Sequence, residues 1–537
     1  MENRLAKALE NGEFAITVEF IPGRGANEDS QEHELQIARD LAGNPRIAAY
    51  SITDNPSGNP ALLADAFAED IIKETGMTPL VHLTCKDRNH NQIESQLYAM
   101  ERRGIQNVLC MTGDYPVTGY TSRPRPVFDL DSVTIVQMIQ EMNKGMAYPG
   151  RKGEPVATKP CHFYPGVVTS PFKWTEGEGY TQYYKLDKKC RAGAKFIMSQ
   201  IGFDPRKMEE LLLVLKEQGH GNVPVFANIF VLPKGVGKSM NAGNFPGCYV
   251  SDELVAVLEE ESKAEDKGKA KRFERAAKQI AVAKGLGYAG CHIGGIGLNA
   301  EAVMHVIELA DEFEANWMDY IQELSFGMPG AWYMYEKDEA TGLNKIVYDE
   351  KYHIYHPVRR PQAPADKRRV VQKNYALSRF VHKFMMNPGH GFYGAFSSIM
   401  ARKDRKKGHH RKHTIENVGK VVLYGCMSCG DCGLPSVAYI CPMTQCPKCQ
   451  RNGPCGGSHM GYCEVFPNER LCVYYRAYHR LHKYGEEDKL IGYMVPPVNW
   501  DHFETSGWSN YVTGRDNISH RQYLDKRWEH ETPVPKK

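Results

Sequence analysis

Eight short apolar runs recur along the first three hundred residues, and they constrain the fold more than any other feature of the sequence. The runs are residues 14–20, 47–53, 79–84, 107–113, 161–168, 195–201, 224–232 and 289–296. Helix-like stretches separate them, and several of these end in glycine, a residue that commonly terminates a helix before the next strand. The longest interval holds a Lys-, Glu- and Ala-rich helix predicted over 253–286. Strand then helix, repeated eight times, predicts an α/β fold, the (β/α)8 TIM barrel.

A barrel alone does not account for 537 residues. We expect the barrel domain over 1–315, a proline-punctuated linker over 316–371, and a smaller cysteine-rich domain with a tail over 372–537. A net charge of +3 gives no overall attraction to nucleic acid or to a membrane surface. The sequence has no apolar signal segment at its start and no run of about 18 apolar residues, so it indicates a cytoplasmic protein without a membrane span.

Polar residues are expected at the carboxyl ends of the predicted strands, where barrels of this kind carry their chemistry. The first run alternates, which puts Glu19 on the inward face just before a Pro-Gly turn. The other residues in such positions are Thr53, Asp54, His82, Thr84, Thr112, Asp114, Tyr164 and Gln200. Each alone has an ordinary explanation, such as a turn aspartate or a hydrogen-bonded core histidine. Their shared placement predicts one ligand site.

Six segments stand in a characteristic order along residues 10–315: VEFIPGRG, SITDNPSG, HLTCKDRN, NVLCMTGDYP, AGAKFIMSQIGFD and AGCHIGGIG. Together they resemble the motifs of the methylenetetrahydrofolate reductase family. The resemblance implies a (β/α)8 barrel with a flavin, FAD or FMN, at its mouth. It also implies reduction of 5,10-methylenetetrahydrofolate to 5-methyltetrahydrofolate, or of a related pterin carrier.

The resemblance further implies roles for individual residues. Glu19 matches the family's catalytic acid, and we expect burial to raise its pKa toward the working pH. Asp114 matches an aspartate near the pterin and flavin that stabilises the cationic iminium, and Gln200 matches a pterin-binding glutamine. The positions that match flavin contacts are Thr53, His82, Thr112, Tyr164, Lys189 and Ala194.

Three positions depart from the family pattern. Thr112 stands where the family commonly has Arg, Val168 where it has His, and Gln182 where it has an acidic residue. All three match positions that contact the tail of the flavin, so the sequence does not distinguish FAD from FMN.

Nine of the fifteen cysteines lie between residues 426 and 472. Dense cysteines without a secretory signal favour metal binding over disulfides. The spacing C-x2-C-x2-C followed by Cys-Pro suits a 4Fe–4S cluster, with zinc as the alternative. The first candidate set is Cys426, Cys429, Cys432 and Cys441. The second is drawn from Cys446, Cys449, Cys455, Cys463 and Cys472, with one thiol to spare, and here zinc and a second cluster are not distinguished.

The segment QCPKCQRNGPCGGSHMGYCEV (445–465) resembles the C-terminal partner domain of methylenetetrahydrofolate reductases from anaerobes, which is often a separate subunit. That resemblance implies electron delivery from a redox protein, such as ferredoxin or a larger electron-transfer complex. One alternative is a structural zinc domain, with NAD(P)H or another donor reducing the flavin directly. Another is a folate-binding scaffold without catalysis.

The basic tract 402–413 is either a solvated loop or a docking surface for an acidic partner or for the polyglutamate tail of folate. No aromatic residues interleave with its basic ones, so no nucleic acid partner is expected. The sequence leaves a homo-oligomer open.

Overall fold

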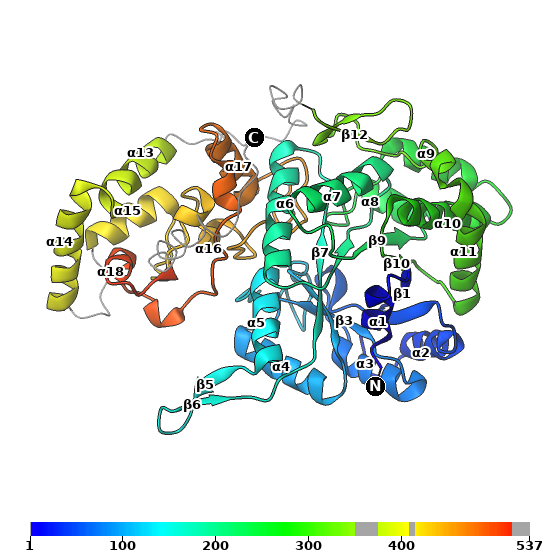
Figure 1. Ribbon diagram of the computed structural model, residues 1–537, viewed down its shortest axis with the longest axis horizontal. Helices are drawn as coiled ribbons and strands as arrows, with labels where there is room; N and C mark the ends of the chain where they lie inside the picture. Colours follow the sequence, from blue (N-terminus) through cyan, green and yellow to red (C-terminus); the bar gives the residue numbers. More distant parts are fainter. Residues whose placement is uncertain (1, 350–373, 408–413, 518–537) are drawn as a thin grey trace.

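The computed structural model describes residues 2–349, 374–407 and 414–517 of the chain. Eight parallel strands close into a barrel in the order β1-β10-β9-β8-β7-β4-β3-β2 (Figure 1). They are β1 (Ala15–Phe20), β2 (Ile47–Ile52), β3 (Leu80–Thr84), β4 (Asn107–Met111), β7 (Tyr164–Thr169), β8 (Phe196–Ser199), β9 (Val225–Phe230) and β10 (Gly290–Gly294). Seven of them lie within the apolar runs and β7 extends one residue beyond its run, so the predicted barrel is confirmed.

Helices surround the barrel, and most present an apolar stripe to the strands. They are α2 (Asp29–Leu41), α3 (Ala64–Thr75), α4 (His90–Arg102), α5 (Ser132–Lys144), α6 (Glu176–Arg191), α7 (Pro205–Glu217), α8 (Lys234–Asn241), α9 (Asp252–Glu261), α10 (Lys269–Leu286) and α11 (Ala300–Phe313). The single helix predicted over 253–286 is two helices, because Lys267 and Gly268 both adopt positive φ (54° and 75°) and break it. A small exposed hairpin, β5 (Ala147–Pro149) and β6 (Pro155–Ala157), projects from the barrel (Figure 1).

The amino-terminal end of the barrel is closed by α1 (Arg4–Glu10), whose Leu5 and Leu9 pack against the inward-facing side chains of the strands. Tyr164 belongs to this end, because it is the first residue of β7 and stacks on Phe196 with ring centroids 5.9 Å apart. The prediction that Tyr164 marks the carboxyl end of its strand is therefore wrong. That end is formed by Thr169 instead.

Residues 316–348, expected as part of a linker, are packed onto the barrel. They contain the end of a 3-10 segment (Glu314–Tyr320) and the hairpin of β11 (Tyr335–Lys337) and β12 (Asn344–Tyr348). Trp332 is fully buried, and Ile321 and Leu324 form a small core with Val282 of α10. The rest of the predicted linker, from residue 350 onward, lies outside the described residues.

The C-terminal domain is small and largely helical, with α13 (Asn374–Val381), α14 (Gly391–Lys407), α15 (Thr414–Tyr424), α16 (Pro442–Gln445), α17 (Val473–His482) and α18 (Gly507–Val512). It lies to one side of the barrel, with α17 alongside α6 (Figure 1). The basic tract is partly seen: residues 402–407 end α14, whereas 408–413 lie outside the described residues. Over the described ranges no helix combines the length and apolar character needed to cross a bilayer.

Helix α6 is buried on nearly all sides, since the barrel covers one face and the C-terminal domain covers the other. Two glycines permit this close packing. A Cβ added at Gly177 would lie 3.0 Å from the ring of Tyr478, and one at Gly179 would lie 2.4 Å from the ring of Trp332. The helix is therefore the shared wall of the two domains.

Asn452 makes four buried hydrogen bonds at the junction, two to the barrel and two within its own domain. Its backbone N and its Nδ2 donate to the carboxylate of Asp131 (3.1 and 2.9 Å), the residue that caps α5. Its Nδ2 also donates to the carbonyl oxygen of Val495 at 2.8 Å, and its Oδ1 accepts from the Val495 amide at 2.6 Å. All the polar atoms of this side chain are thus satisfied inside the interface.

Asn452→Ala is expected to lower the free energy of unfolding by about 2–4 kcal/mol, because each lost buried hydrogen bond contributes about 1 kcal/mol. Urea denaturation followed by circular dichroism measures the change. Asn11→Ala, at the exposed end of α1, is the matched control and is expected to change stability by less than about 0.5 kcal/mol. A loss for Asn452→Ala as small as that of the control would contradict the role of this junction.

Candidate functional site

Glu19 lies inside the barrel near its carboxyl end, with its side chain 20% exposed. Its Oε1 is 3.7 Å from Nε2 of His292, a residue of β10 that is hydrogen-bonded through Nδ1 to Thr17 Oγ1 at 2.9 Å. Gly294 makes room for the carboxylate, because a Cβ there would lie 2.7 Å from Glu19 Oε2. His82 stands nearby, with its ring centroid 6.4 Å from that of His292. The mouth therefore holds one carboxylate between two imidazoles.

The electrostatics of this group differ from the sequence expectation. Burial raises the pKa of Glu19, but the His292 imidazole, with a smaller contribution from His82, lowers it by more, and the net shift is downward. The expected upward shift is thus absent, because β10 supplies a partner that sequence analysis did not include. Burial lowers the pKa of His82 to about 4, so this imidazole is neutral at neutral pH. It is hydrogen-bonded through Nε2 to Ser51 Oγ at 2.8 Å.

The end of β2 is fixed by a buried ion pair. Asp54 accepts two hydrogen bonds from Arg88, at 2.8 and 2.9 Å, and two more from the amide and hydroxyl of Thr84. Burial raises the pKa of Asp54, but Arg88 and Thr84 lower it by a larger amount. The net shift is downward, and the carboxylate is ionised. Thr53, next to it, donates its amide to Phe20 O at 3.1 Å. These contacts hold the ends of β1, β2 and β3 together.

Asp114 and Gln200 stand at the ends of two further strands. The Asp114 carboxylate accepts a hydrogen bond from the Ser57 amide at 2.8 Å, in the loop after β2. Gln200 follows β8, and a Cβ added at Gly247 would lie 3.4 Å from its Nε2 and 3.1 Å from the carbonyl oxygen of Gly456. Gly247 therefore lies close both to the predicted pterin-binding glutamine and to a loop of the cysteine-rich domain.

The same loop covers the end of β4. Thr112 is buried and donates its hydroxyl to Gln450 Oε1 at 3.0 Å. Lys185 of α6, also buried, donates to that oxygen at 2.8 Å and to Gly453 O at 3.3 Å. The buried Lys173 donates to the carbonyl oxygens of Gly456 and Ser458.

Several buried donors beneath this loop are without a partner. Thr169 Oγ1, Ser170 Oγ and Gln182 Nε2 make no hydrogen bond within the described structure, although each side chain is at least nine-tenths buried. Lys189 lies one helical turn from Lys185 and donates to Val168 O. Burial lowers the pKa of Lys189 to about 7, and Lys185 adds to the effect. Unsatisfied donors beside two lysines fit a polar, anionic ligand.

Six of the predicted flavin and pterin residues thus gather at the mouth or its border: Glu19, Thr53, His82, Thr112, Asp114 and Gln200. Lys189 is a residue of α6, and its side chain extends to the Val168 carbonyl of β7. Tyr164 and Ala194 are not brought there. Ala194 precedes β8, at the amino-terminal end of that strand, and is buried beside the end of α6.

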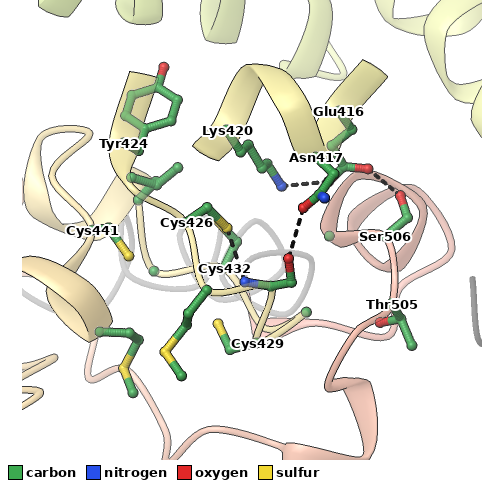
Figure 2. A pocket seen from close by; sticks show the side chains of 17 residues that line it. Glu416, Asn417, Lys420, Tyr424, Cys426, Cys429, Cys432, Cys441, Thr505 and Ser506 are labelled. Carbon is green, nitrogen blue, oxygen red and sulfur yellow. Dashed lines mark hydrogen bonds and ion pairs between the residues drawn. The ribbon is translucent and has the colours of Figure 1, made fainter. Parts of the chain in front are cut away.

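The first cysteine set lines one pocket of the C-terminal domain. Figure 2 shows Cys426, Cys429, Cys432 and Cys441 around it, with α15 forming one wall. That wall contributes an ion pair between Lys420 Nζ and Glu416 Oε1, 2.6 Å apart. Burial raises the pKa of Cys429 to about 11 and that of Cys432 to about 12.

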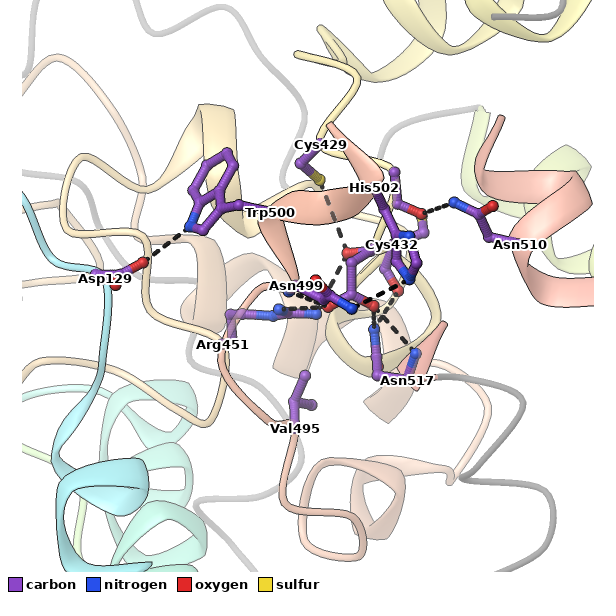
Figure 3. Close-up of polar contacts among 12 residues, drawn as sticks. Asp129, Cys429, Cys432, Arg451, Val495, Asn499, Trp500, His502, Asn510 and Asn517 are labelled. Atoms are coloured by element: carbon purple, nitrogen blue, oxygen red, sulfur yellow. Dashed lines mark hydrogen bonds and ion pairs between the residues drawn. The ribbon is translucent and has the colours of Figure 1, made fainter. Parts of the chain in front are cut away.

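A buried carboxylate, Asp431, shapes the loop between Cys429 and Cys432. It pairs with Arg451 at 3.1 Å and accepts from the backbone amides of Asn499 (3.3 Å) and Asn517 (3.0 Å). Figure 3 shows Arg451, Asn499 and Asn517 converging from three segments of the domain. The pKa of Asp431 is raised by burial but lowered more by Arg451 and Asn517. The described part of the tail, residues 486–517, therefore packs on its own domain, and Trp500 also donates to Asp129 of the barrel at 2.9 Å.

The second cysteine set lines another pocket, with Cys446, Cys455, Cys463 and Cys472 in its wall. Cys449 lines neither of the two pockets, and its thiol contacts the Met443 carbonyl at 3.8 Å. Burial raises the pKa of Cys455, but Lys448, the Gly457 amide and two further lysines lower it by more. Within the described ranges, no three His, Cys, Asp or Glu side chains are close enough together to hold a single metal ion.

Family models match both parts of the chain. The model for methylenetetrahydrofolate reductase matches residues 4–309, and a model described as "Methylene-tetrahydrofolate reductase C terminal" matches residues 406–501. The chain belongs to the methylenetetrahydrofolate reductase family. Both resemblances noted in the sequence are thereby confirmed.

Individual relatives of this reductase family are distant. Methylenetetrahydrofolate reductase (NADH) 1 of Arabidopsis thaliana is 24% identical over 48% of this chain and 42% of its own length. Methylenetetrahydrofolate reductase 2 of Schizosaccharomyces pombe is 21% identical over 47% and 38%. The match thus spans about two fifths of either relative. A solved structure, an uncharacterized protein from Clostridium thermocellum that binds two copies of 5-methyl-5,6,7,8-tetrahydrofolic acid, is 12% identical over 58% of this chain and 99% of its own, with a TM-score of 0.41.

Sequence analysis missed three residues at this family's mouth. His292 lies in a glycine-rich strand without apolar alternation, and its place opposite Thr17 becomes evident only from the strand register in the structure. Gln450 and Lys448 come from the other domain, more than 330 residues from the strand they contact, and no local pattern predicts such a contact.

Glu34, on α2 at the border of the mouth, makes the stability of the fold depend on pH. Burial raises its pKa to about 7, while the Ile21 amide, which donates to it at 2.9 Å, opposes the shift. The unfolded carboxyl ionises near pH 4.5, so the native state loses stability as the pH rises from there to about 7.

Glu34→Gln keeps the hydrogen-bond acceptor and removes this loss. We expect a gain in unfolding free energy of about 1 kcal/mol at pH 8, discounted for partial exposure, and a much smaller gain at pH 5. Urea denaturation at both pH values measures it, with Glu308→Gln on the exposed face of α11 as control. Equal effects at the two pH values would disprove the assignment.

Proposed function

We propose that the chain reduces 5,10-methylenetetrahydrofolate to 5-methyltetrahydrofolate with a bound flavin. The observation that carries this proposal is the placement of Glu19, beside His292 and inside the mouth of a barrel of this family. Asp114 and Gln200, at the ends of two other strands, complete the group that the family resemblance assigns to the pterin.

Glu19 is proposed as the general acid. Opening the methylene bridge requires a proton on the departing aryl nitrogen, and a carboxyl group in the barrel can supply it. The donated proton stays on the aryl nitrogen of the product, so Glu19 needs a new proton from solvent, and His292, 3.7 Å away, can relay it. Asp114 would stabilise the cationic iminium that the opening produces. Bound pterin would exclude water from Glu19, which favours its protonated form.

The flavin, when bound, supplies the hydride chemistry, and the residues present fit its polar tail. Thr169, Ser170 and Gln182 offer unsatisfied buried donors, with Lys185 and Lys189 beside them. Thr53, His82 and Thr112 are the further proposed contacts at the mouth. We propose FMN rather than FAD, because Thr112 and Lys185 are already bonded to Gln450, which leaves less room for an adenine half.

Glu19→Gln is expected to lower kcat at least about 10²-fold, because general acid catalysis contributes 10² to 10⁴. Flavin content and melting temperature should stay at the wild-type values. Steady-state reduction with a chemically reduced donor measures the effect, and Glu308→Gln, on the exposed face of α11, is the control. Unchanged turnover in Glu19→Gln would remove the general-acid assignment. No turnover in the wild type would favour the scaffold alternative.

For the cysteine-rich domain we propose a 4Fe–4S cluster at Cys426, Cys429, Cys432 and Cys441. The spacing of these residues and their common pocket support it. We propose a second metal site, zinc or a further cluster, at Cys446, Cys455, Cys463 and Cys472. Iron–sulfur centres supply one-electron transfer, which suits a redox protein as the donor. The alternative is structural zinc, with NAD(P)H or another donor acting at the flavin.

Elemental analysis of the anaerobically purified protein tests this arrangement. Cys432→Ser is expected to lose about four irons and their sulfide per chain. Cys449→Ser, which alters the thiol outside both pockets, should keep the full metal content. Zinc in place of iron in the wild type would establish the structural alternative. Metal loss in Cys449→Ser would show that the two sets are divided differently.

A further inference from the structure

Lys448 crosses from the cysteine-rich domain into the mouth of the barrel. It stands between Cys446 and Cys449 in the sequence, and its ammonium donates to the carbonyl oxygen of Gly113 at 2.7 Å. The same ammonium pairs with the carboxylate of Glu464. The side chains of Lys448 and Glu464 are only 3% and 7% exposed, so this contact is shielded from solvent.

Gly113 is the residue between Thr112 and Asp114, and it has little freedom to move. Its φ is +83°, and a Cβ there would lie 2.7 Å from Thr84 Cβ and 3.3 Å from Lys86 Cδ. The backbone is thus packed closely against the end of β3, and its carbonyl is held by Lys448 on the other side. The carboxylate of Asp114 is held separately, by the Ser57 amide at 2.8 Å.

We propose that Lys448 is a positioning residue of the reductase site, which acts through Gly113 to hold Asp114 in place. This inference rests on the proposed function for the role of Asp114. The cysteine-rich domain would then complete the geometry of the mouth in addition to any part in electron delivery. The geometry favours lysine, because a single ammonium can reach both a carbonyl and a carboxylate in a narrow space.

The contact also joins the mouth to the second cysteine pocket. Glu464 directly follows Cys463, and both line that pocket together with Lys448. One buried ammonium thus touches the peptide before Asp114 and a wall residue of the thiol site.

Lys448 is not needed simply to dock the domain. Asn452, Lys173 and Lys185 make six further hydrogen bonds across the domain interface. A variant that loses the Lys448 contact while keeping these should stay folded and docked.

The test compares Glu464→Gln with the double variant Lys448→Met/Glu464→Gln, both carrying their metals and flavin. The first keeps the donor to Gly113, and the second removes it without leaving a buried unpaired charge. Hydrogen–deuterium exchange of peptides covering residues 111–116 reports positioning directly, and steady-state kinetics with reduced methyl viologen report catalysis. Lys278→Met is the control. It removes a lysine of α10 that is paired with Glu274 and Glu323.

We expect the double variant to exchange faster over 111–116 than Glu464→Gln and to show a kcat lower by about 10²-fold, with a smaller change in KM. Lys278→Met should leave both readouts at the wild-type level. Wild-type exchange in the double variant would overturn the proposal, whatever its turnover, and so would faster exchange with unchanged kcat. If the double variant does not fold, Lys448→Arg, which keeps the charge but displaces the contact, replaces it and should show the same faster exchange. A wild-type protein without reductase activity would overturn the proposed function instead, while the exchange data would still decide whether Lys448 holds Gly113.

Discussion

Three buried lysines at the junction of the two domains determine how the rest of the molecule is arranged. Lys173 and Lys185 extend from the barrel to oxygens of the cysteine-rich loop, and Lys448 extends from that loop to a barrel carbonyl. A buried ammonium is costly unless it is fully hydrogen-bonded, and here part of each lysine's hydrogen bonding comes from the other domain. Neither surface would be stable in this form alone. The interface therefore belongs to the fold as much as any strand pairing does.

The packing of the barrel follows from this junction. Helix α6 carries Lys185, and its outer face is covered by α17, so it is buried all round and needs glycines where aromatic rings approach. The loop over the mouth bonds to Thr112 at the end of β4, and its Gly456 lies near Gly247, which in turn lies near Gln200. A ligand bound at the mouth would consequently lie under a cover that the first domain does not supply.

Features that repeat locally could be predicted from the sequence, and features that depend on distant contacts could not. Recurring apolar runs and the glycine-ended helical stretches between them indicated eight strands, and alternation in the first run directed Glu19 inward. Tyr164 was misplaced because its strand begins inside an apolar run that extends beyond it on the amino side. His292 has no such alternating pattern, and its effect on the pKa of Glu19 appears only when β10 lies beside β1. The cysteine spacing indicated two sets, but only the packing of the loop separates Cys449 from them.

The ion pair between Lys448 and Glu464 has a thermodynamic consequence. Because one ammonium contacts both the mouth and the wall of the second thiol pocket, a change of charge in that pocket alters the energy of the Gly113 contact. Linkage is reciprocal, so a ligand that binds at the mouth must shift the charge equilibrium of the thiol pocket by the same free energy. Binding at the mouth and the charge state of the thiol pocket are therefore coupled. A substitution that strengthens ligand binding at the mouth also changes the pH range over which the pocket carries a given charge.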